Sequence, residues 1–141
     1  TGGFIKNPPY REVCQGRTGH TEGISFDYDE TLVSYVDLLE VFFATHDPTT
    51  LNRQANDVGT QYRSIILTTT ANQAESGRKV IDSYQELLTS AGYGNIVTVV
   101  KPLDTFYPAE EYHQDYLVKN PNGYCPDHST GVKFFASESI I

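Results

Sequence analysis

The chain has 141 residues, of which 38% are hydrophobic and 20% are charged, and its formal net charge is −8 at pH 7. This length and composition predict one globular domain with its own apolar core. The ten Lys and Arg residues are scattered singly, which argues against a nucleic-acid partner, and no apolar run approaches the roughly 20 residues of a membrane helix.

The first third of the chain predicts a loop, a strand and a helix. Residues 1–22 are rich in Gly, Pro, Asn and Thr without a sustained period, which indicates a loop. Apolar and polar residues alternate over 24–28, as in a half-buried strand. Helical spacing begins at Tyr35, with Ser34 as the N-cap. The polar stretch 47–61 is expected to be a long loop, a kind of segment that is often functional.

The middle of the chain alternates strands and a helix. Residues 64–67 predict a short apolar strand, and 96–100 predict a buried β-branched strand. Between them, 71–91 has the spacing of a helix that stops at Gly92. The residues expected on the inner face of this helix are Val80, Ile81, Tyr84, Leu87 and Leu88.

The last part of the chain predicts one more helix and a tail. Pro108 and the two glutamates that follow it favour a helix start, with the end near Lys119. Residues 119–141 are expected to form a mobile C-terminal tail. The whole order predicts a single domain over 1–141, of α+β or α/β class, with helices against one sheet.

Several side chains stand where a polar pocket could form, although each has a plainer interpretation. Glu22 precedes a predicted strand, where partial burial would raise its pKa and suit it to general-acid catalysis, or it is a surface glutamate. Asp57 and Tyr62 flank Gly59, so their side chains could converge, or they form an Asx-turn and an edge aromatic. Tyr10 follows two prolines that stiffen its backbone.

The cysteines and histidines limit other chemistries. Cys125 lies in the predicted tail, where a thiol can reach another sulfur as a resolving cysteine must, or it is an idle surface thiol. Cys14 is interpreted as a free structural thiol. The four histidines lack metal-ligand spacing, so a metal site is not expected. His113, between Tyr112 and Tyr116, is interpreted as a hydrogen-bonded structural residue.

Taken together, the polar segments resemble the motifs of the peptide-methionine (S)-S-oxide reductases, the A-type methionine sulfoxide reductases. The matching segments occur in family order and cover nearly the whole chain. They are YREVCQGRTGHTE (10–22), HDPTTLNRQ (46–54), NDVGTQYRS (56–64), FYPAEEYHQDY (106–116) and NPNGYC (120–125). The resemblance implies a ferredoxin-like two-layer sandwich of mixed sheet and helices with long loops, lacking the family's first strand and first helix.

The resemblance also implies a role for each polar residue. Glu22 would protonate the sulfoxide oxygen, Tyr10 and Tyr62 would hydrogen-bond it, and Asp57 would organise the pocket through water. Cys125 would attack the sulfenic acid left on the nucleophile, and thioredoxin, or dithiothreitol in vitro, would reduce the disulfide. The implied substrate is methionine-S-sulfoxide, free or in proteins. A monomer in the cytoplasm, without a cofactor, is the expected state.

One departure from the family pattern leaves three hypotheses open. The family's nucleophile stands in a Gly-Cys-Phe-Trp-Gly segment, which these residues do not contain, and a second recycling cysteine is replaced at Lys133. The chain could be the downstream part of a reductase whose nucleophile is Cys or selenocysteine. It could be a catalytically inactive module that binds methionine sulfoxide. The least favoured hypothesis makes Cys14 or Cys125 the nucleophile.

Overall fold

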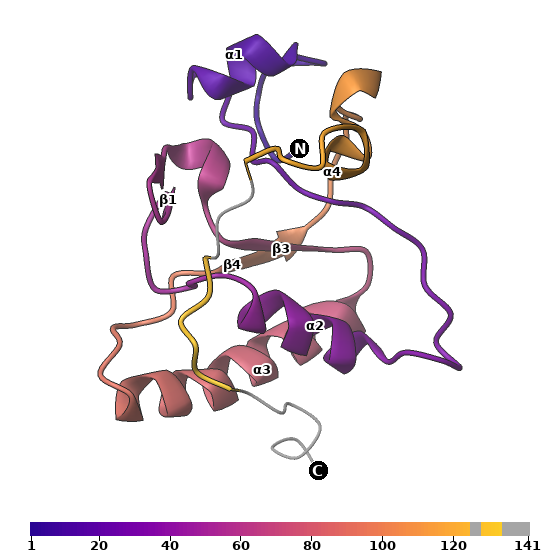
Figure 1. Ribbon diagram of the computed structural model, residues 1–141. Coiled ribbons are helices and arrows are strands. Elements are labelled where there is room, and N and C mark those ends of the chain that lie inside the picture. Colours follow the sequence, from indigo (N-terminus) through magenta and orange to yellow (C-terminus); the bar gives the residue numbers. More distant parts are fainter. Residues whose placement is uncertain (125–127, 134–141) are drawn as a thin grey trace.

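The computed structural model of the protein describes residues 1–124 and 128–133 (Figure 1). Helices α2 and α3 pack together below a small parallel sheet, and α1 and α4 lie on the other side of that sheet (Figure 1). The helices are α1 (Tyr10–Cys14), α2 (Tyr35–Ala44), α3 (Ala71–Ser90) and α4 (Tyr116–Lys119), with 3-10 turns η1 (Thr60–Tyr62) and η2 (Glu111–His113). The strands are β1 (Arg53–Gln54), β2 (Asp57–Val58), β3 (Ile65–Thr68) and β4 (Val99–Pro102).

A β–α–β unit forms the centre of the fold. Strands β3 and β4 pair in parallel, with Ile65 opposite Val99 and Thr68 opposite Pro102. Parallel neighbours need a crossover connection, and α3 provides it. This helix contacts both strands on one side and α2 on the other. The predicted α+β class and its two-layer arrangement of helices and sheet are therefore confirmed.

Helix α2 begins where the sequence predicted. The Ser34 hydroxyl accepts the backbone N–H of Asp37 at 3.1 Å, and the Asp37 carboxylate accepts the backbone N–H of Ser34 at 3.0 Å. This reciprocal capping box satisfies two N–H groups that have no partner inside the helix. Leu39 and Phe43 stand one helical turn apart on the buried face, so α2 contributes both to the core.

Helix α3 confirms most of its predicted inner face. Val80, Tyr84 and Leu88 are spaced four residues apart and are completely buried. The helix stops at Gly92, whose φ of +89° is a left-handed conformation that suits glycine. The prediction for Leu87 was wrong: its side chain is 40% exposed, because one step along a helix turns a side chain by about 100° away from its neighbour.

The predicted strand at 24–28 was wrong. These residues have no assigned strand or helix, and the apolar side chains of Ile24 and Phe26 are 86% and 55% exposed. Alternation specifies a strand only where a partner strand pairs with it and an apolar layer covers one of its faces. Within the described part of the chain this segment has neither, and it runs as a long arc toward α2 (Figure 1).

The helix predicted from Pro108 to Lys119 was also wrong as a single element. The structure divides it into η2 and α4, and Asp115 between them has a left-handed φ of +51°. A left-handed residue cannot continue the α-helical hydrogen-bond ladder, so the chain turns there. The Pro108 segment itself is irregular, and the first regular residue is Glu111.

Three further boundaries differ from those expected. The predicted loop 1–22 contains helix α1, and the predicted loop 47–61 contains a short antiparallel hairpin of β1 and β2 followed by η1. The strand expected at 96–100 is shifted to β4, where Val99 is 46% exposed and so is not buried. Each of these elements is only two to five residues long, too short for periodicity to identify it.

Part of the C-terminal region rests on the core. The Tyr84 hydroxyl donates to the backbone oxygen of Val132 at 3.2 Å, and the Tyr93 hydroxyl donates to that of Thr130 at 2.8 Å. Val132 also packs against the hydrophobic core. The mobility of 119–141 as a whole stays a prediction. Over residues 1–124 and 128–133, no helix has the length and apolarity to cross a bilayer.

Candidate active site

Hydrogen bonds of Gln61 bring three distant segments together. The backbone oxygen of Gln61 accepts the N–H of Glu22 at 2.9 Å and the hydroxyl of Thr21 at 3.1 Å. Its side-chain amide donates to the backbone oxygen of Cys14 at 3.1 Å. Because Tyr62 follows Gln61 in η1, these bonds place Tyr62, Glu22 and helix α1 beside one another.

Helix α1 is held from the other end of the chain. Pro9 has an extended backbone before Tyr10, and the helix has no side-chain cap from its N-cap residue. Glu110 instead accepts the backbone N–H of Tyr10 at 3.2 Å, and its second oxygen accepts the hydroxyl of Tyr112 at 2.9 Å. A carboxylate on a first-turn N–H is favourable because the N-terminal N–H groups of a helix carry partial positive charge.

The assembled segments enclose a cavity of about 650 Å³. Tyr10 and Glu22 line it, together with Phe106, Tyr107 and His113 from the segment before α4. Asp57 and Tyr62 lie outside this lining but within electrostatic reach of Glu22. The structure therefore brings together the four described residues that the sequence singled out for a polar site.

Burial raises the pKa of the Glu22 carboxyl above its usual range. The side chain has an exposed surface, but that surface faces the cavity, where surrounding protein replaces much of the bulk solvent. The charge of Asp57 raises the pKa of Glu22 further, whereas a charged His113 lowers it. A carboxyl in this environment keeps its proton to higher pH than an ordinary glutamic acid and can serve as a general acid.

Both phenols are also held in the protonated form. A side-chain hydrogen bond with Cys14, followed by burial and the charges of Cys14 and Glu22, raises the pKa of Tyr10. Burial, with the charges of Glu22 and Asp57, raises the pKa of Tyr62. A neutral phenol donates one O–H, so at neutral pH Tyr10 and Tyr62 each offer a hydrogen bond to an acceptor oxygen.

Asp57 has a neighbour that the sequence did not indicate. It stands in β2, at the end of the two-stranded hairpin, and its carboxylate oxygen lies 3.7 Å from Nε2 of His128. His128 comes from the C-terminal segment that rests on the core. Sequence spacing could not reveal this pair because the contact depends on how that segment folds back.

The sequence interpretation missed the position of His113. Its ring centroid lies 3.9 Å from that of Tyr10, and it lines the same cavity as Glu22. Its buried Nε2 has no hydrogen-bond partner among the described residues, so the interpretation of a hydrogen-bonded structural histidine fails at that atom. The sequence feature that could have indicated an aromatic environment for His113 is its position between Tyr112 and Tyr116, whose rings also contact it.

The structure describes one of the two cysteines. Cys14 is a free thiol with an exposed side chain beside Tyr10. Cys125, the predicted resolving cysteine, lies outside the described residues, so its role stays a prediction. In the described part of the chain, no three Cys, His, Asp or Glu side chains are grouped as a metal site requires.

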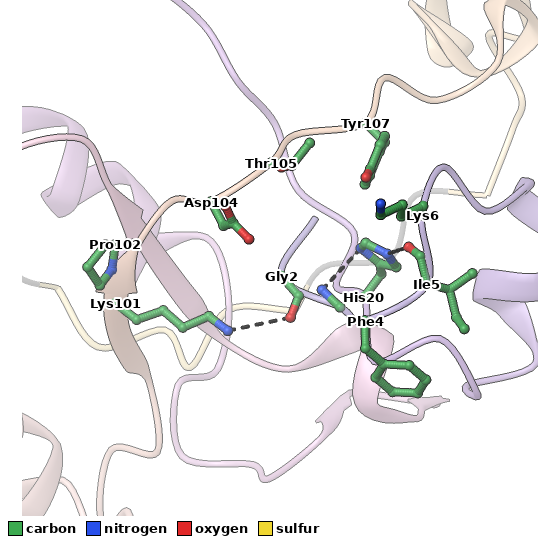
Figure 2. A pocket seen from close by; sticks show the side chains of 11 residues that line it. Gly2, Phe4, Ile5, Lys6, His20, Lys101, Pro102, Asp104, Thr105 and Tyr107 are labelled. Carbon is green, nitrogen blue, oxygen red and sulfur yellow. Dashed lines mark hydrogen bonds between the residues drawn. The ribbon is translucent and has the colours of Figure 1, made fainter.

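A second cavity of about 410 Å³ adjoins the first, and Figure 2 shows its lining. His20 and Tyr107 line both cavities. The N–H of Gly3 donates to Nδ1 of His20 at 3.2 Å, so Nε2 carries the proton and donates to the oxygen of Ile5 at 2.6 Å (Figure 2). Both ring nitrogens are therefore satisfied, and His20 is a structural residue between the cavities.

Glycine is required at position 3 for this arrangement. A Cβ atom there would lie 2.4 Å from the backbone nitrogen of His20 and from the backbone oxygen of Thr18. Backbone atoms cannot move aside as a flexible side chain can, so a larger residue would separate the N-terminal segment from His20. The wall between the two cavities thus depends on this close approach.

Comparison with known proteins places the chain in a family. The model of the family described as peptide methionine sulfoxide reductase matches residues 1–139. The chain is 52% identical to the peptide methionine sulfoxide reductase MsrA of Corynebacterium kroppenstedtii, over 93% of this chain and 62% of that relative. It is 54% identical to the MsrA of Haloquadratum walsbyi, over 91% of this chain and 72% of that relative.

Solved structures give the same relationship. Methionine sulfoxide reductase A of Corynebacterium diphtheriae superposes with a TM-score of 0.85 at 48% identity, covering 94% of this chain and 66% of that one. Mxr1 from Saccharomyces cerevisiae in reduced form superposes with a TM-score of 0.79 at 36% identity, covering 94% and 71%.

The structure is an α+β domain in which Tyr10 and Glu22 line one cavity and Tyr62 lies within electrostatic reach of Glu22. The chain belongs to the peptide methionine sulfoxide reductases, a family of oxidoreductases. It spans 62% and 61% of the length of the first two corynebacterial relatives.

Proposed function

We propose that this chain forms the oxygen-binding part of a methionine-S-sulfoxide reductase that repairs oxidised methionine, free or in proteins. The observation that supports this most directly is the environment of Glu22. Its pKa is raised by burial, and it stands beside two phenols that also keep their protons. Two neutral donors that line one cavity, with a third within electrostatic reach, suit an acceptor oxygen such as that of a sulfoxide.

The proposed first step transfers the oxygen from methionine sulfoxide to a thiol. Glu22 gives its proton to the sulfoxide oxygen as a thiolate attacks the sulfur, and the hydrogen bonds of Tyr10 and Tyr62 stabilise the charge shift on that oxygen. The net change is R₂S=O + RSH → R₂S + RSOH, in which methionine is reduced and the thiol becomes a sulfenic acid. Asp57, held near His128, would order water in the pocket.

The proposed recycling uses Cys125 and an external dithiol. Cys125 attacks the sulfenic acid, which releases water and forms a disulfide, and a dithiol reductant such as thioredoxin then reduces this disulfide. The nucleophile of the first step would be the sulfur of a cysteine, or the selenium of a selenocysteine, in a segment outside these 141 residues. A monomer in a thioredoxin-containing cytoplasm, without a metal or organic cofactor, completes the proposal.

The alternative function is sulfoxide binding without reduction. The same donors would hold the ligand, and the absence of the Gly-Cys-Phe-Trp-Gly segment from this sequence is the observation that favours it.

The proposal is tested on the complete gene product with dithiothreitol as reductant. We expect reduction of N-acetyl-methionine-(S)-sulfoxide, little reduction of the R form, and a loss of about 100-fold or more in kcat/KM in E22Q. The matched control is E12Q, because Glu12 is an exposed glutamate on α1 and should leave turnover unchanged. Binding without turnover would support the alternative, and the absence of both would contradict each function.

A further inference from the structure

His113 makes ring contacts that play no part in the reaction proposed above. It ends η2, and three phenol rings surround it: its ring centroid lies 3.9 Å from Tyr10, 4.9 Å from Tyr112 and 6.1 Å from Tyr116. Tyr10 belongs to α1 and Tyr116 to α4, so the imidazole is packed between elements from opposite ends of the chain. Such packing fixes the plane of the Tyr10 ring.

The backbone around His113 is held by the same carboxylate that holds Tyr10. Glu110 binds the Tyr10 N–H through one oxygen and the Tyr112 hydroxyl through the other. The bond to Tyr10 therefore ties the segment that carries His113 to α1, and the bond to Tyr112 lies within that segment. His113 therefore keeps a defined place at the cavity wall, where Glu22 also stands.

The imidazole is electrostatically coupled to Glu22. A positive charge on His113 stabilises the Glu22 carboxylate and so lowers the pKa of Glu22, against the effect of burial. The other titratable groups around His113 are Tyr10 from α1, Tyr116 from α4, and Glu110, Glu111 and Tyr112 on its own segment. Among the described residues, the buried Nε2 of His113 has no hydrogen-bond partner.

We propose that His113 is a positioning residue of the sulfoxide site, which orients the phenol of Tyr10 and couples its own charge to the Glu22 carboxyl at the same cavity wall. This inference rests on the proposed function, because that function requires Glu22 to carry a proton. With a neutral imidazole, Glu22 keeps the proton that the sulfoxide oxygen needs. With an imidazolium, the same proton count is distributed as Glu22 carboxylate and charged His113, and Glu22 then has no proton to give to the sulfoxide oxygen.

The coupling is measured directly by titrating the Glu22 carboxyl carbon by NMR in the 141-residue chain. H113Q removes the charge and stays polar, whereas H113F removes the charge and keeps a ring on Tyr10. We expect the pKa of Glu22 to rise in both variants. It should stay unchanged in Y116F, which keeps the Tyr116 ring and removes only an exposed hydroxyl.

Two outcomes would overturn the inference. An unchanged Glu22 titration in H113Q means that the charge of His113 does not reach the acid. A rise in H113F alone means that added burial, not lost charge, shifted the carboxyl. H113N repeats the test if the H113Q chain does not fold, since it also replaces the ring by a neutral amide.

Binding of N-acetyl-methionine-(S)-sulfoxide supplies an independent readout. The pH above which the chain loses affinity for the sulfoxide should move upward in H113Q and H113F, because Glu22 then keeps its proton to higher pH. H113Q should also bind about two- to tenfold more weakly than H113F at low pH, since only the phenylalanine keeps the ring pair with Tyr10. If the wild-type chain binds no sulfoxide, the proposed function fails, while the Glu22 titration still decides whether His113 and Glu22 are coupled.

Discussion

Glu110 accepts the backbone N–H of Tyr10 at 3.2 Å and so joins the segment before α4 to the first turn of α1. Helix α1 has five residues and no side-chain cap of its own, and a helix this short is not stable in isolation. The position of the Tyr10 phenol at the cavity therefore depends on this contact and on the bond from Gln61 to Cys14.

Removing that contact should loosen α1 and lower sulfoxide affinity. We expect E110A to cost about 1 kcal/mol or more of unfolding free energy, because two hydrogen bonds to a charged group are lost. Urea denaturation measures the change. E111A is the matched control: the Glu111 side chain is 92% exposed and, among the described residues, forms one ion pair, with Lys119, so its loss should cost less than about 0.5 kcal/mol. Equal effects of the two variants would contradict the role of Glu110.

The raised pKa of Glu22 has a consequence for stability. Between the ordinary pKa of a glutamic acid and the raised pKa in the folded state, the folded protein holds a proton that unfolding releases. Stability from this group is therefore present at low pH and is lost as pH rises through that window. E22Q has no such loss, so its stability relative to the wild type should increase from pH 4 to pH 8.

The measurement is the urea midpoint of both proteins across that pH range. E12Q serves as the control, since Glu12 is exposed on α1, and its midpoint should follow that of the wild type at every pH. A wild type that gains stability over E22Q as pH rises would mean that the carboxylate of Glu22, and not its acid form, is favoured by the fold.

The thiol of Cys14 should tune Tyr10 without reacting. The hydrogen bond with Cys14 is the largest cause of the raised pKa of Tyr10. We expect C14A to lower the pKa of the Tyr10 phenol, measured by NMR of its ring carbon bonded to oxygen. The complete gene product carrying C14A should still reduce sulfoxide. An unchanged Tyr10 titration would show that the two side chains do not interact, and a loss of all turnover would restore Cys14 as a candidate nucleophile.

Two neighbouring leucines test the orientation of α3. Leu88 is completely buried in the core, whereas Leu87 is 40% exposed. We expect L88A to cost about 2–4 kcal/mol of unfolding free energy, from lost burial and the cavity left behind. L87A should cost about 1 kcal/mol or less. Urea denaturation of both variants measures the ratio, and similar costs would mean that the helix is rotated from the orientation described.

The sequence predicted the parts of the fold that long periodic segments determine. Helices α2 and α3 were found because their apolar residues recur over several turns, and because Ser34 marks the start of α2 and Gly92 the end of α3. The false strand at 24–28 has the alternation of a real one. What it lacks is a partner, and partners are contributed by residues far away in the chain, which local pattern cannot reveal.

The site depended even more on distant contacts. Spacing alone left Glu22, Asp57 and Tyr62 with plain surface interpretations, and only the resemblance to a family grouped them. The physical connection is Gln61, whose bonds join residues on three separate segments. The ring contact between Tyr10 and His113 joins residues from opposite ends of the chain, so no motif within one segment could have predicted it.

The most direct test of the account is an NMR titration of the 141-residue chain with N-acetyl-methionine-(S)-sulfoxide, observed at the carboxyl carbon of Glu22. We predict a saturable change in the chemical shift of this carbon. The pKa of Glu22 should rise on binding, because the ligand oxygen favours the acid form, and the R form should have a much weaker effect. A folded chain in which neither form perturbs Glu22 would contradict the claim that these residues form a sulfoxide site.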